Sequence, residues 1–174
     1  MANYAYMGKG IVRMQKEGST EPAIDLGNVS NLTFNVNENV INLANYRTAG
    51  GGNYAQVRRI ETVEVSMTLT DLSPENLAMV LFGTATVEAN VATIEALTTG
   101  AQTFTMLFEG VNEANTGKTV NVTVHRLKVG ASQGLGLIGD EFAALEVTGE
   151  ALLDTSITDP GLSQFFRVEM DVIT

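Results

Sequence analysis

The sequence predicts a mainly β fold, a β-sandwich or partial barrel with one flanking α-helix. The first reason is that several segments alternate apolar and polar residues with a period of two, which is typical of strands with one buried face. The second is that a single segment combines a helix start signal with a helix stop signal. At 174 residues and 44% hydrophobic content the chain can bury one core, so we expect a single domain over residues 1–174.

Strands are expected along most of the chain. Alternation predicts them at residues 10–16, 31–37, 62–70, 103–108, 120–125, 141–153 and 166–172, with turns or bends near 17–22, 112–117 and 130–139. The segment 141–153 is also rich in Ala, Leu and Glu, which favour a helix. Because Val147, Thr148 and Gly149 stand in its middle, we predict a strand there instead.

The expected helix covers residues 74–82. Ser73 stands at the N-cap position, and Pro74 takes the first helical position, where a missing N–H costs nothing. Gly83 follows the last turn and is expected to be the C′ residue that ends the helix. The apolar residues of the helix lie on one side, so it should cover a face or an edge of a sheet. Residues 84–100 show a weak pattern, and we expect irregular chain or a short strand there.

Residues 38–56 separate the second and third expected strands. They read ENVINLANYRTAGGGNYAQ, which is far longer than the about two to five residues that a tight hairpin needs. Fully extended, a chain of this length reaches about 60 Å, so a loop folded back on itself could project roughly 30 Å. We therefore expect an extended loop at 38–56 that contacts another molecule.

The charge is unevenly distributed. Residues 1–60 hold six basic and four acidic residues, a net charge of +2, whereas residues 61–174 hold four basic and sixteen acidic residues, a net charge of −12. This asymmetry permits head-to-tail contact between copies, although an acidic surface can equally serve solubility alone. Adhesive binding to nucleic acid is not expected, because that requires a basic patch.

Nothing in the sequence predicts a membrane or export segment. No apolar run approaches the ~18 residues of a membrane span, and the first residues have neither a basic nor an apolar export region. The chain has no cysteine, which suits assembly in a reducing cytosol.

Residues that could support catalysis are few. His125 is the single histidine and there is no cysteine, so we expect a hydrogen-bonded or solvent-facing histidine, not a zinc site or a nucleophile–histidine pair. Residues 134–139 fit the letters GxGxxG, but a dinucleotide site needs that motif to open a helix in a βαβ unit, and a bend is predicted here. The Gly50-Gly51-Gly52 run lacks the Lys-Ser/Thr of a phosphate loop and is expected to supply positive φ angles or a close backbone approach.

Paired carboxylates are the remaining candidates for acid–base chemistry. On one strand face Glu146 and Glu150 would lie about 13 Å apart. A glycosidase pair needs about 5–9.5 Å. We therefore expect no enzyme, and no catalytic, cofactor or metal site.

Six stretches of the sequence occur in an order that resembles one family. They are Leu-Gly-Asn-Val at 26–29, Asn-Tyr-Arg-Thr-Ala-Gly-Gly-Gly-Asn-Tyr at 45–54, Arg-Arg-Ile at 58–60, Leu-Ser-Pro-Glu-Asn-Leu-Ala at 72–78, Leu-Phe-Gly at 81–83 and Phe-Ala-Ala-Leu-Glu-Val-Thr-Gly-Glu at 142–150. Over most of the chain the sequence thereby resembles the tail tube, or major tail, proteins of long non-contractile-tailed bacteriophages.

The resemblance implies a phage tail tube or type VI tube-like fold and a structural role in the virion tail. Such proteins form hexameric rings that stack into a tube, a conduit for DNA passage into the host. Sheets of neighbouring subunits join around the lumen, and an extended loop reaches the adjacent ring. For this chain the implied partners are copies of itself and other tail proteins at the tube ends, with DNA passing without specific binding, no membrane, and assembly in the bacterial host cytoplasm.

Carried onto this sequence, the resemblance makes residues 38–56 the inter-ring loop. Aromatic and Arg side chains dominate interface energetics, so its expected contact residues are Tyr46, Arg47 and Tyr54, with Gly50, Gly51 and Gly52 between them. A polar strand face would line the lumen, and its candidates are Glu64, Ser66, Thr68, Glu146, Thr148 and Glu150. Carboxylates on that face would repel the phosphate backbone and let DNA slide.

Other functions stay open on the sequence alone. One is a type VI secretion-like tube protein, which shares the fold. Another is a monomeric β-sandwich binding module that uses the long loop to hold a ligand. An enzyme comes last, because no constellation of catalytic residues supports it.

Overall fold

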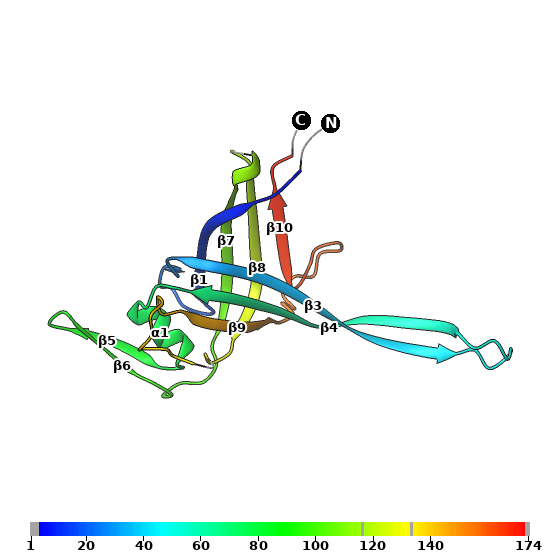
Figure 1. Cartoon of the computed structure of the whole chain (residues 1–174), viewed down its shortest axis with the longest axis horizontal. Helices are drawn as coiled ribbons and strands as arrows, with labels where there is room; N and C mark the ends of the chain where they lie inside the picture. The colour runs from blue at the N-terminus through cyan, green and yellow to red at the C-terminus, as the bar shows by residue number, and fades with distance from the viewer. Residues whose placement is uncertain (1–3, 116, 133, 173–174) are drawn as a thin grey trace.

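The computed structural model describes residues 4–115, 117–132 and 134–172, so Thr116 in the expected turn and Gln133 in the expected bend lie outside the described residues. The elements, in chain order, are β1 (Gly8–Lys16), β2 (Ile24–Asp25), β3 (Val29–Ala44), β4 (Asn53–Leu69), α1 (Pro74–Val80), β5 (Thr84–Glu88), β6 (Val91–Glu95), β7 (Thr103–Asn112), the 3-10 turn η1 (Glu113–Asn115), β8 (Thr119–Val129), β9 (Leu145–Ala151) and β10 (Phe166–Met170). The mainly β fold class with one α-helix is thus confirmed for the described chain (Figure 1).

The main sheet has eight strands and folds over on itself at β8. Its order is β2-β1-β7-β8-β9-β4-β3, and β10 also pairs with β8. One side of β8 pairs with β7; on the other side residues 120–124 pair with β10 and residues 127–129 with β9. Two layers result: β1, β7, β8 and β10 stand upright, and β3, β4 and β9 run across them (Figure 1).

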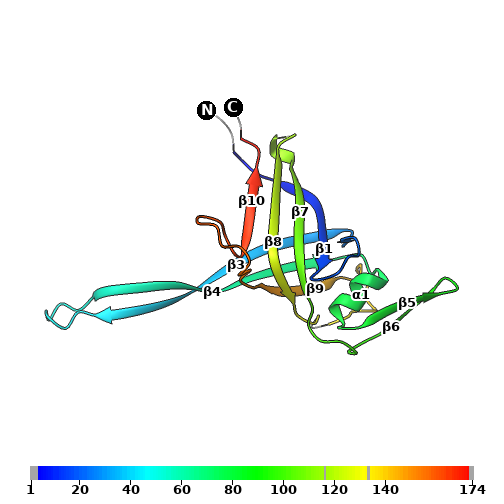
Figure 2. The ribbon, with the colours of Figure 1, turned by 180° about the vertical axis from the view of Figure 1, so that it is seen from behind.

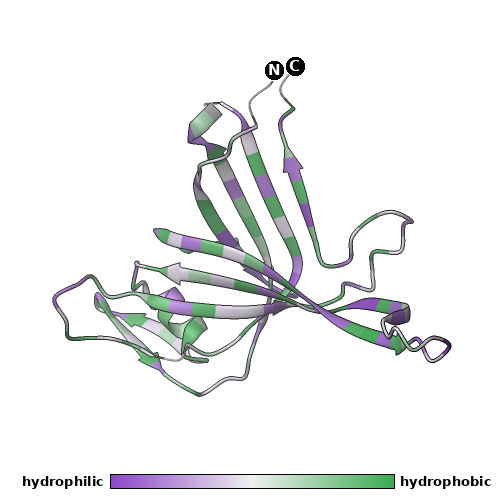
Figure 3. Cartoon of the chain, turned by 45° about the vertical axis from the view of Figure 1, so that its right-hand side comes forward, coloured by the Kyte–Doolittle hydropathy of each residue, from purple (hydrophilic) through white to green (hydrophobic). Residues whose placement is uncertain are grey.

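The core lies between these layers, and the period-two pattern explains its composition. Inward-facing residues of β4 alternate with polar ones and are almost completely buried, from Val63 at 2% exposure to Leu69 at 0%. The same alternation colours the upright strands in Figure 3. Large side chains buried with them include Met14, Met67, Met106, Leu127 and Leu145.

The sandwich is open along one seam. The strand order ends at β2 and β3, so the sheet is not closed into a barrel. At the seam the β3 ring of Phe34 packs on the β10 ring of Phe166, with 5.5 Å between the ring centroids. The outer edge of β3 therefore presents backbone groups that no strand of the described chain pairs.

The helix α1 begins as predicted and ends differently. Ser73 Oγ accepts a hydrogen bond from the Asn76 amide at 3.1 Å, which caps the N-terminus. At the other end Phe82, not Gly83, is the left-handed C′ residue, with φ of 49°, and the Gly83 amide donates to the Ala78 carbonyl at 2.8 Å. Gly83 is needed for another reason, because a Cβ atom there would overlap the Glu95 carbonyl oxygen.

Residues 84–95 form a hairpin where only a weak pattern was visible. β5 and β6 pair in register, and the turn residues Ala89 and Asn90 have φ of 47° and 66°, as a two-residue hairpin turn requires. The hairpin packs beside α1 at the end of the sandwich opposite the long β3–β4 extension (Figure 2).

Candidate assembly surface

The expected loop at 38–56 is mostly a pair of strands, so that prediction is corrected. Pairing of β3 with β4 continues from Glu38 and Ile60 to Ala44 and Asn53, and only residues 45–52 form the loop. We call residues 38–60 the arm. Seven residues of β3 span about 24 Å, and the arm projects well clear of the body in both views (Figures 1 and 2). The loop interpretation failed because backbone pairing continues past the point where the core ends.

The outer part of one face of the arm, beyond the pair Asn39–Arg59, is apolar and open to solvent. Residues paired directly across an antiparallel ladder lie on the same face, so the pairs Ile41–Val57 and Leu43–Ala55 share one side. Ile41, Leu43 and Val57 are 54%, 52% and 48% exposed. Sequence reasoning named none of these residues, although alternate apolar positions at 41, 43, 55 and 57 were a usable signal.

The opposite face of the arm carries a chain of polar contacts. Gln56 Nε2 donates to Asn42 Oδ1 at 2.8 Å, and Arg58 Nε donates to Gln56 Oε1 at 2.8 Å. Arg58 Nη1 also pairs with Glu38 Oε2 at 3.0 Å. Exposed pairs of this kind add little free energy, about 0–1 kcal/mol each, but they hold the two strands in one register.

The tip of the arm carries most of the predicted contact residues. The Asn45 amide donates to the Gly52 carbonyl at 2.9 Å, and the Arg47 amide donates to Asn45 Oδ1 at 2.9 Å. Gly51 and Gly52 have φ of 70° and 91°, the positive values expected for the glycine run. Tyr46 is 87% exposed at the tip, whereas Tyr54, 64% exposed, lies in β4. Arg47 and Gly50 are also exposed in the tip loop.

The six residues proposed for the lumen meet on one face. Pairing of β4 with β9 sets Glu64 opposite Glu150, Ser66 opposite Thr148, and Thr68 opposite Glu146. We call these six residues the polar ladder. Directly opposed carboxylates repel each other, and Lys128, which lies opposite Glu150 on β8, supplies a compensating charge.

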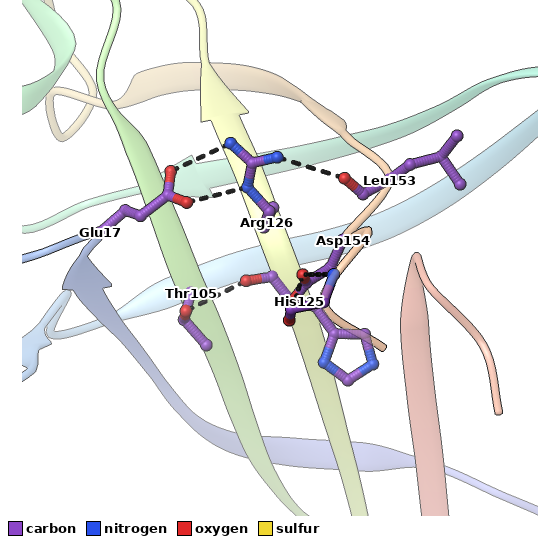
Figure 4. Close-up of polar contacts among 7 residues, drawn as sticks. Glu17, Thr105, His125, Arg126, Leu153 and Asp154 are labelled. Atoms are coloured by element: carbon purple, nitrogen blue, oxygen red, sulfur yellow. Dashed lines mark hydrogen bonds and ion pairs between the residues drawn. The ribbon is translucent and has the colours of Figure 1, made fainter. Parts of the chain in front are cut away.

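Ser156, His125 and Asp154 lie near one another and are the residue types of a catalytic triad, but Ser156 bonds to Asp154 and not to His125. A register shift near Thr105 places both His125 and Arg126 between buried residues, and Thr105 Oγ1 donates to the His125 carbonyl at 3.1 Å (Figure 4). The Ser156 hydroxyl donates to Asp154 Oδ1 at 2.6 Å. His125 Nε2 is buried and has no hydrogen-bond partner among the described residues, so the expected hydrogen-bonded or solvent-facing histidine is wrong for this atom.

Asp154 and Arg126 serve structure in this cluster. Hydrogen bonds from Ser156 lower the pKa of Asp154 below its ordinary value, and the bond from the hydroxyl has a larger effect than the bond from the backbone N–H. Arg126 Nε pairs with Glu17 Oε1 at 2.9 Å, and Arg126 Nη1 donates to the Leu153 carbonyl at 3.2 Å (Figure 4). These contacts join the end of β1 and the chain after β9 to β8.

Two further properties concern only the part of the chain that the structure describes. No three or more His, Cys, Asp or Glu side chains gather there as a metal site would require. No helix in the same residues is long and apolar enough to cross a membrane.

The fold is an open antiparallel β-sandwich with a long two-stranded arm. The sequence profile of a family described as "Protein of unknown function UCP028589" matches residues 5–93 and 87–169, and the chain belongs to that family. None of the curated proteins compared with the chain matches it.

One solved structure with similarity over most of the chain is a cryo-electron microscopy structure of an extracellular contractile injection system, the PVC sheath–tube complex in its extended state. The likeness covers 95% of this chain and 89% of that chain, at 12% identity and a TM-score of 0.42.

Proposed function

We propose that the chain is a structural tube subunit that polymerises with copies of itself as stacked hexameric rings. The arm is the observation that carries this proposal. It exposes an apolar face that the core of its own chain does not use, and its tip holds Tyr46 and Arg47 outside the body. Large exposed apolar surfaces of this kind mark contacts with other proteins. The arm would reach the adjacent ring.

Open sheet edges support lateral assembly within a ring. The outer edge of β3 has no partner strand in the described chain, and neither does the outer edge of β10. Joining such edges around a closed ring satisfies their backbone N–H and C=O groups. The number of six copies comes from the resemblance of the sequence to tail tube proteins.

The polar ladder is proposed to line the lumen. Its three carboxylates, Glu64, Glu146 and Glu150, would repel DNA phosphates, so DNA passing into the host would slide without specific binding. The location is then the virion tail, with other tail proteins at the tube ends and assembly in the host cytoplasm. The sequence resemblance favours a long non-contractile tail, in which no sheath surrounds the tube.

Light scattering and negative-stain microscopy of the purified protein test the proposal. We expect rings or tubes of uniform width. Deleting residues 49–53 from the tip should leave a folded domain that does not form tubes. A matched control replaces Ala89-Asn90 by Asn-Gly, which keeps the β5–β6 turn geometry and should leave assembly unchanged.

A chain that stays monomeric at high concentration with its arm intact would overturn the tube function and favour the monomeric binding module. Tubes that form normally without residues 49–53 would overturn the role of the arm alone. A sheath copurifying around the tube would contradict the non-contractile tail.

The role of the polar ladder has its own test. Changing Glu64, Glu146 and Glu150 together to Lys should make assembled tubes retain DNA and should slow DNA ejection from particles. The control is Glu88→Lys, on the exposed β5–β6 hairpin away from the ladder. Ejection of unchanged speed and yield in the triple variant would contradict a lumenal position.

A further inference from the structure

A second apolar surface lies in the chain between β8 and β9. We call residues 134–144 the apolar loop. Leu137 is 74% exposed, Ile138 is 101% exposed and Phe142 is 97% exposed. Three large apolar side chains at this exposure within six residues are unusual for a surface that only faces water. The loop is therefore a second candidate for contact with another molecule.

The apolar loop lies at the end of the body that faces away from the arm. Just before the loop, the Ser132 amide donates to the Val80 carbonyl of α1 at 2.9 Å. Just after it, Leu145 pairs with Leu69, the last residue of β4. The helix α1 and the arm lie at opposite ends of the molecule in both views (Figures 1 and 2).

The apolar loop and the arm of one chain cannot meet. Val57, on the apolar face of the arm, stands twelve residues before Leu69 in the same strand, which is about 40 Å along β4. Phe142 stands three residues before Leu145 and can lie at most about 10 Å from it. Leu145 and Leu69 are neighbours across the β4–β9 ladder. More than about 20 Å therefore separates Phe142 from Val57, and a contact between loop and arm needs two chains.

The outer part of the arm is basic. Residues 39–60 hold Arg47, Arg58 and Arg59 and no acidic residue. Arg58 pairs with Glu38 at the base of the arm, whereas Arg47 and Arg59 take part in none of the ion pairs formed by the described residues. Arg47 stands in the tip loop beside Tyr46, which is 87% exposed. The tip thus combines a free positive charge with an aromatic ring, and Arg and Tyr are enriched at the energetic centres of protein interfaces.

The apolar loop and the chain that follows it are acidic. Residues 130–165 hold six acidic residues and no Lys or Arg. Two of the six, Asp140 and Glu141, lie in the loop and line the same hollow as its exposed apolar side chains. Neither carboxylate takes part in any ion pair of the part of the chain that the structure describes. The loop therefore matches the arm tip in apolar character and opposes it in charge.

We propose that the arm tip of one copy docks on the apolar loop of a second copy, a contact that rests on the proposed self-assembly and names the partner of the arm. In this contact the Arg47 guanidinium pairs with the carboxylates of Asp140 and Glu141. The Tyr46 ring packs against Ile138. The contact is head-to-tail, because it joins two different surfaces at opposite ends of identical chains, so it can repeat from one copy to the next.

Charge reversal tests this contact. Arg47→Glu alone, and Asp140→Arg together with Glu141→Arg, should each raise the concentration at half-assembly about tenfold or more. The chain that carries all three changes should return to within about threefold of the unchanged chain, because the exchanged charges are again opposite. As a control, Lys16→Glu replaces Arg47→Glu in that chain. Lys16 is an exposed cation outside the arm and should give no rescue.

Cysteine cross-linking locates the contact, since the chain has no cysteine of its own. Ala49→Cys in the arm tip of one preparation is mixed with Ile138→Cys in another that carries a size tag. We expect a mixed disulfide dimer after mild oxidation, at least about fivefold more abundant than in the control. The control pairs Ala49→Cys with Val87→Cys, which is 66% exposed on the β5–β6 hairpin. That hairpin packs beside α1, so it lies at the same end of the body as the apolar loop.

The outcomes separate this inference from the tube function. Tubes that form without the expected mixed disulfide overturn the docking contact and leave the tube function standing. The mixed disulfide without rings or tubes supports the contact and overturns the tube function. If a charge variant does not fold, the cross-linking result decides, because its cysteine positions are exposed surface residues.

Three further results would overturn the docking contact. The first is equal disulfide yield in the test and control pairs. The second is a triple charge variant that folds but assembles no better than Arg47→Glu. The third is arm-dependent binding to double-stranded DNA by chains that do not cross-link, because the arginines of the arm would then serve an anionic partner.

Discussion

The two halves of the β3–β4 ribbon share their strands and their antiparallel pairing, with a shift of register between Asn37 and Glu38, yet they differ in what covers them. In the body half, Val65 and Met67 are 0% and 2% exposed because the upright layer packs on them. In the arm, Ile41 and Leu43 are 54% and 52% exposed although regular pairing resumes at Glu38 and Ile60 and continues to Leu43 and Ala55. Pairing alone therefore defines a strand, whereas burial decides what that strand contributes to stability. Apolar residues in the uncovered half are available to a partner.

The largest expected effect is a difference between the two halves in how much a Leu→Ala change lowers the free energy of unfolding. Leu69→Ala in the body should lower the free energy of unfolding by about 2–5 kcal/mol, because it leaves a cavity beside fully buried neighbours. Leu43→Ala in the arm removes the same atoms from an exposed site and should change it by no more than about 0.5 kcal/mol. Urea denaturation below the assembly concentration measures both values. Equal losses in the two variants would show that the arm is packed in the isolated chain.

A smaller effect compares two asparagines. Asn76 is completely buried, and its Nδ2 donates to the carbonyl oxygens of Leu26 at 3.0 Å and Asp71 at 2.9 Å. Asn76→Ala leaves both acceptors without this donor and should cost about 1–3 kcal/mol. Asn42→Ala in the arm breaks an exposed contact with Gln56 and should cost about 0.5 kcal/mol or less.

Thermal or urea unfolding of the two asparagine variants checks the comparison. The buried Asn76 Oδ1 has no partner among the described residues, so replacing it also removes an unsatisfied acceptor. A loss well under about 1 kcal/mol for Asn76→Ala would mean that this relief offsets the broken hydrogen bonds.

The sequence predicts those parts of the fold that the core determines. Alternation located the body strands, because a buried face forces a period of two. It failed where nothing is buried: residues 38–44 and 53–60 are paired strands without a covered face, and β5–β6 is a small hairpin outside the main sheet. Phe82, with φ of 49°, took the position predicted for Gly83, and its carbonyl accepts a hydrogen bond from the Thr99 amide at 2.8 Å, a contact that no local pattern contains.

The candidate surfaces divide in the same way. The polar ladder could be named from the sequence, since its six residues alternate with buried ones on two strands. Its assembly into one face needed the pairing of β4 with β9, which no local pattern contains. The exposure of Leu137 and Ile138, in the expected bend, and of Phe142, in the expected strand 141–153, was likewise not predicted, because exposure depends on what the rest of the fold leaves uncovered.

The smallest expected effect is a difference in acid sensitivity between β10 and the arm. Asp171, just after β10, is tied to β8, because its Oδ2 accepts from the Thr119 amide at 2.8 Å and from the Thr119 hydroxyl at 3.0 Å. These hydrogen bonds lower the pKa of Asp171 below its ordinary value of 3.8, and the bond from the Thr119 amide has the larger effect. Because the pKa of Asp171 is lower in the folded chain than in the unfolded chain, its hydrogen bonds to Thr119 stabilise the fold at pH above the unfolded-state pKa. This contribution is lost as the pH falls through the folded-state pKa.

We therefore expect protection of the Thr119 amide from hydrogen exchange to fall as Asp171 is protonated, while the arm amides show no matching change. Nuclear magnetic resonance can follow both the Asp171 carboxyl titration and the exchange of the Thr119 amide. Asp171→Asn is the matched control, because it keeps the size of the side chain and should remove the acid-dependent step. A step that persists in Asp171→Asn would assign the pH dependence to another carboxylate, and β10 would then be held to β8 by its backbone ladder alone, as the arm strands are held to each other.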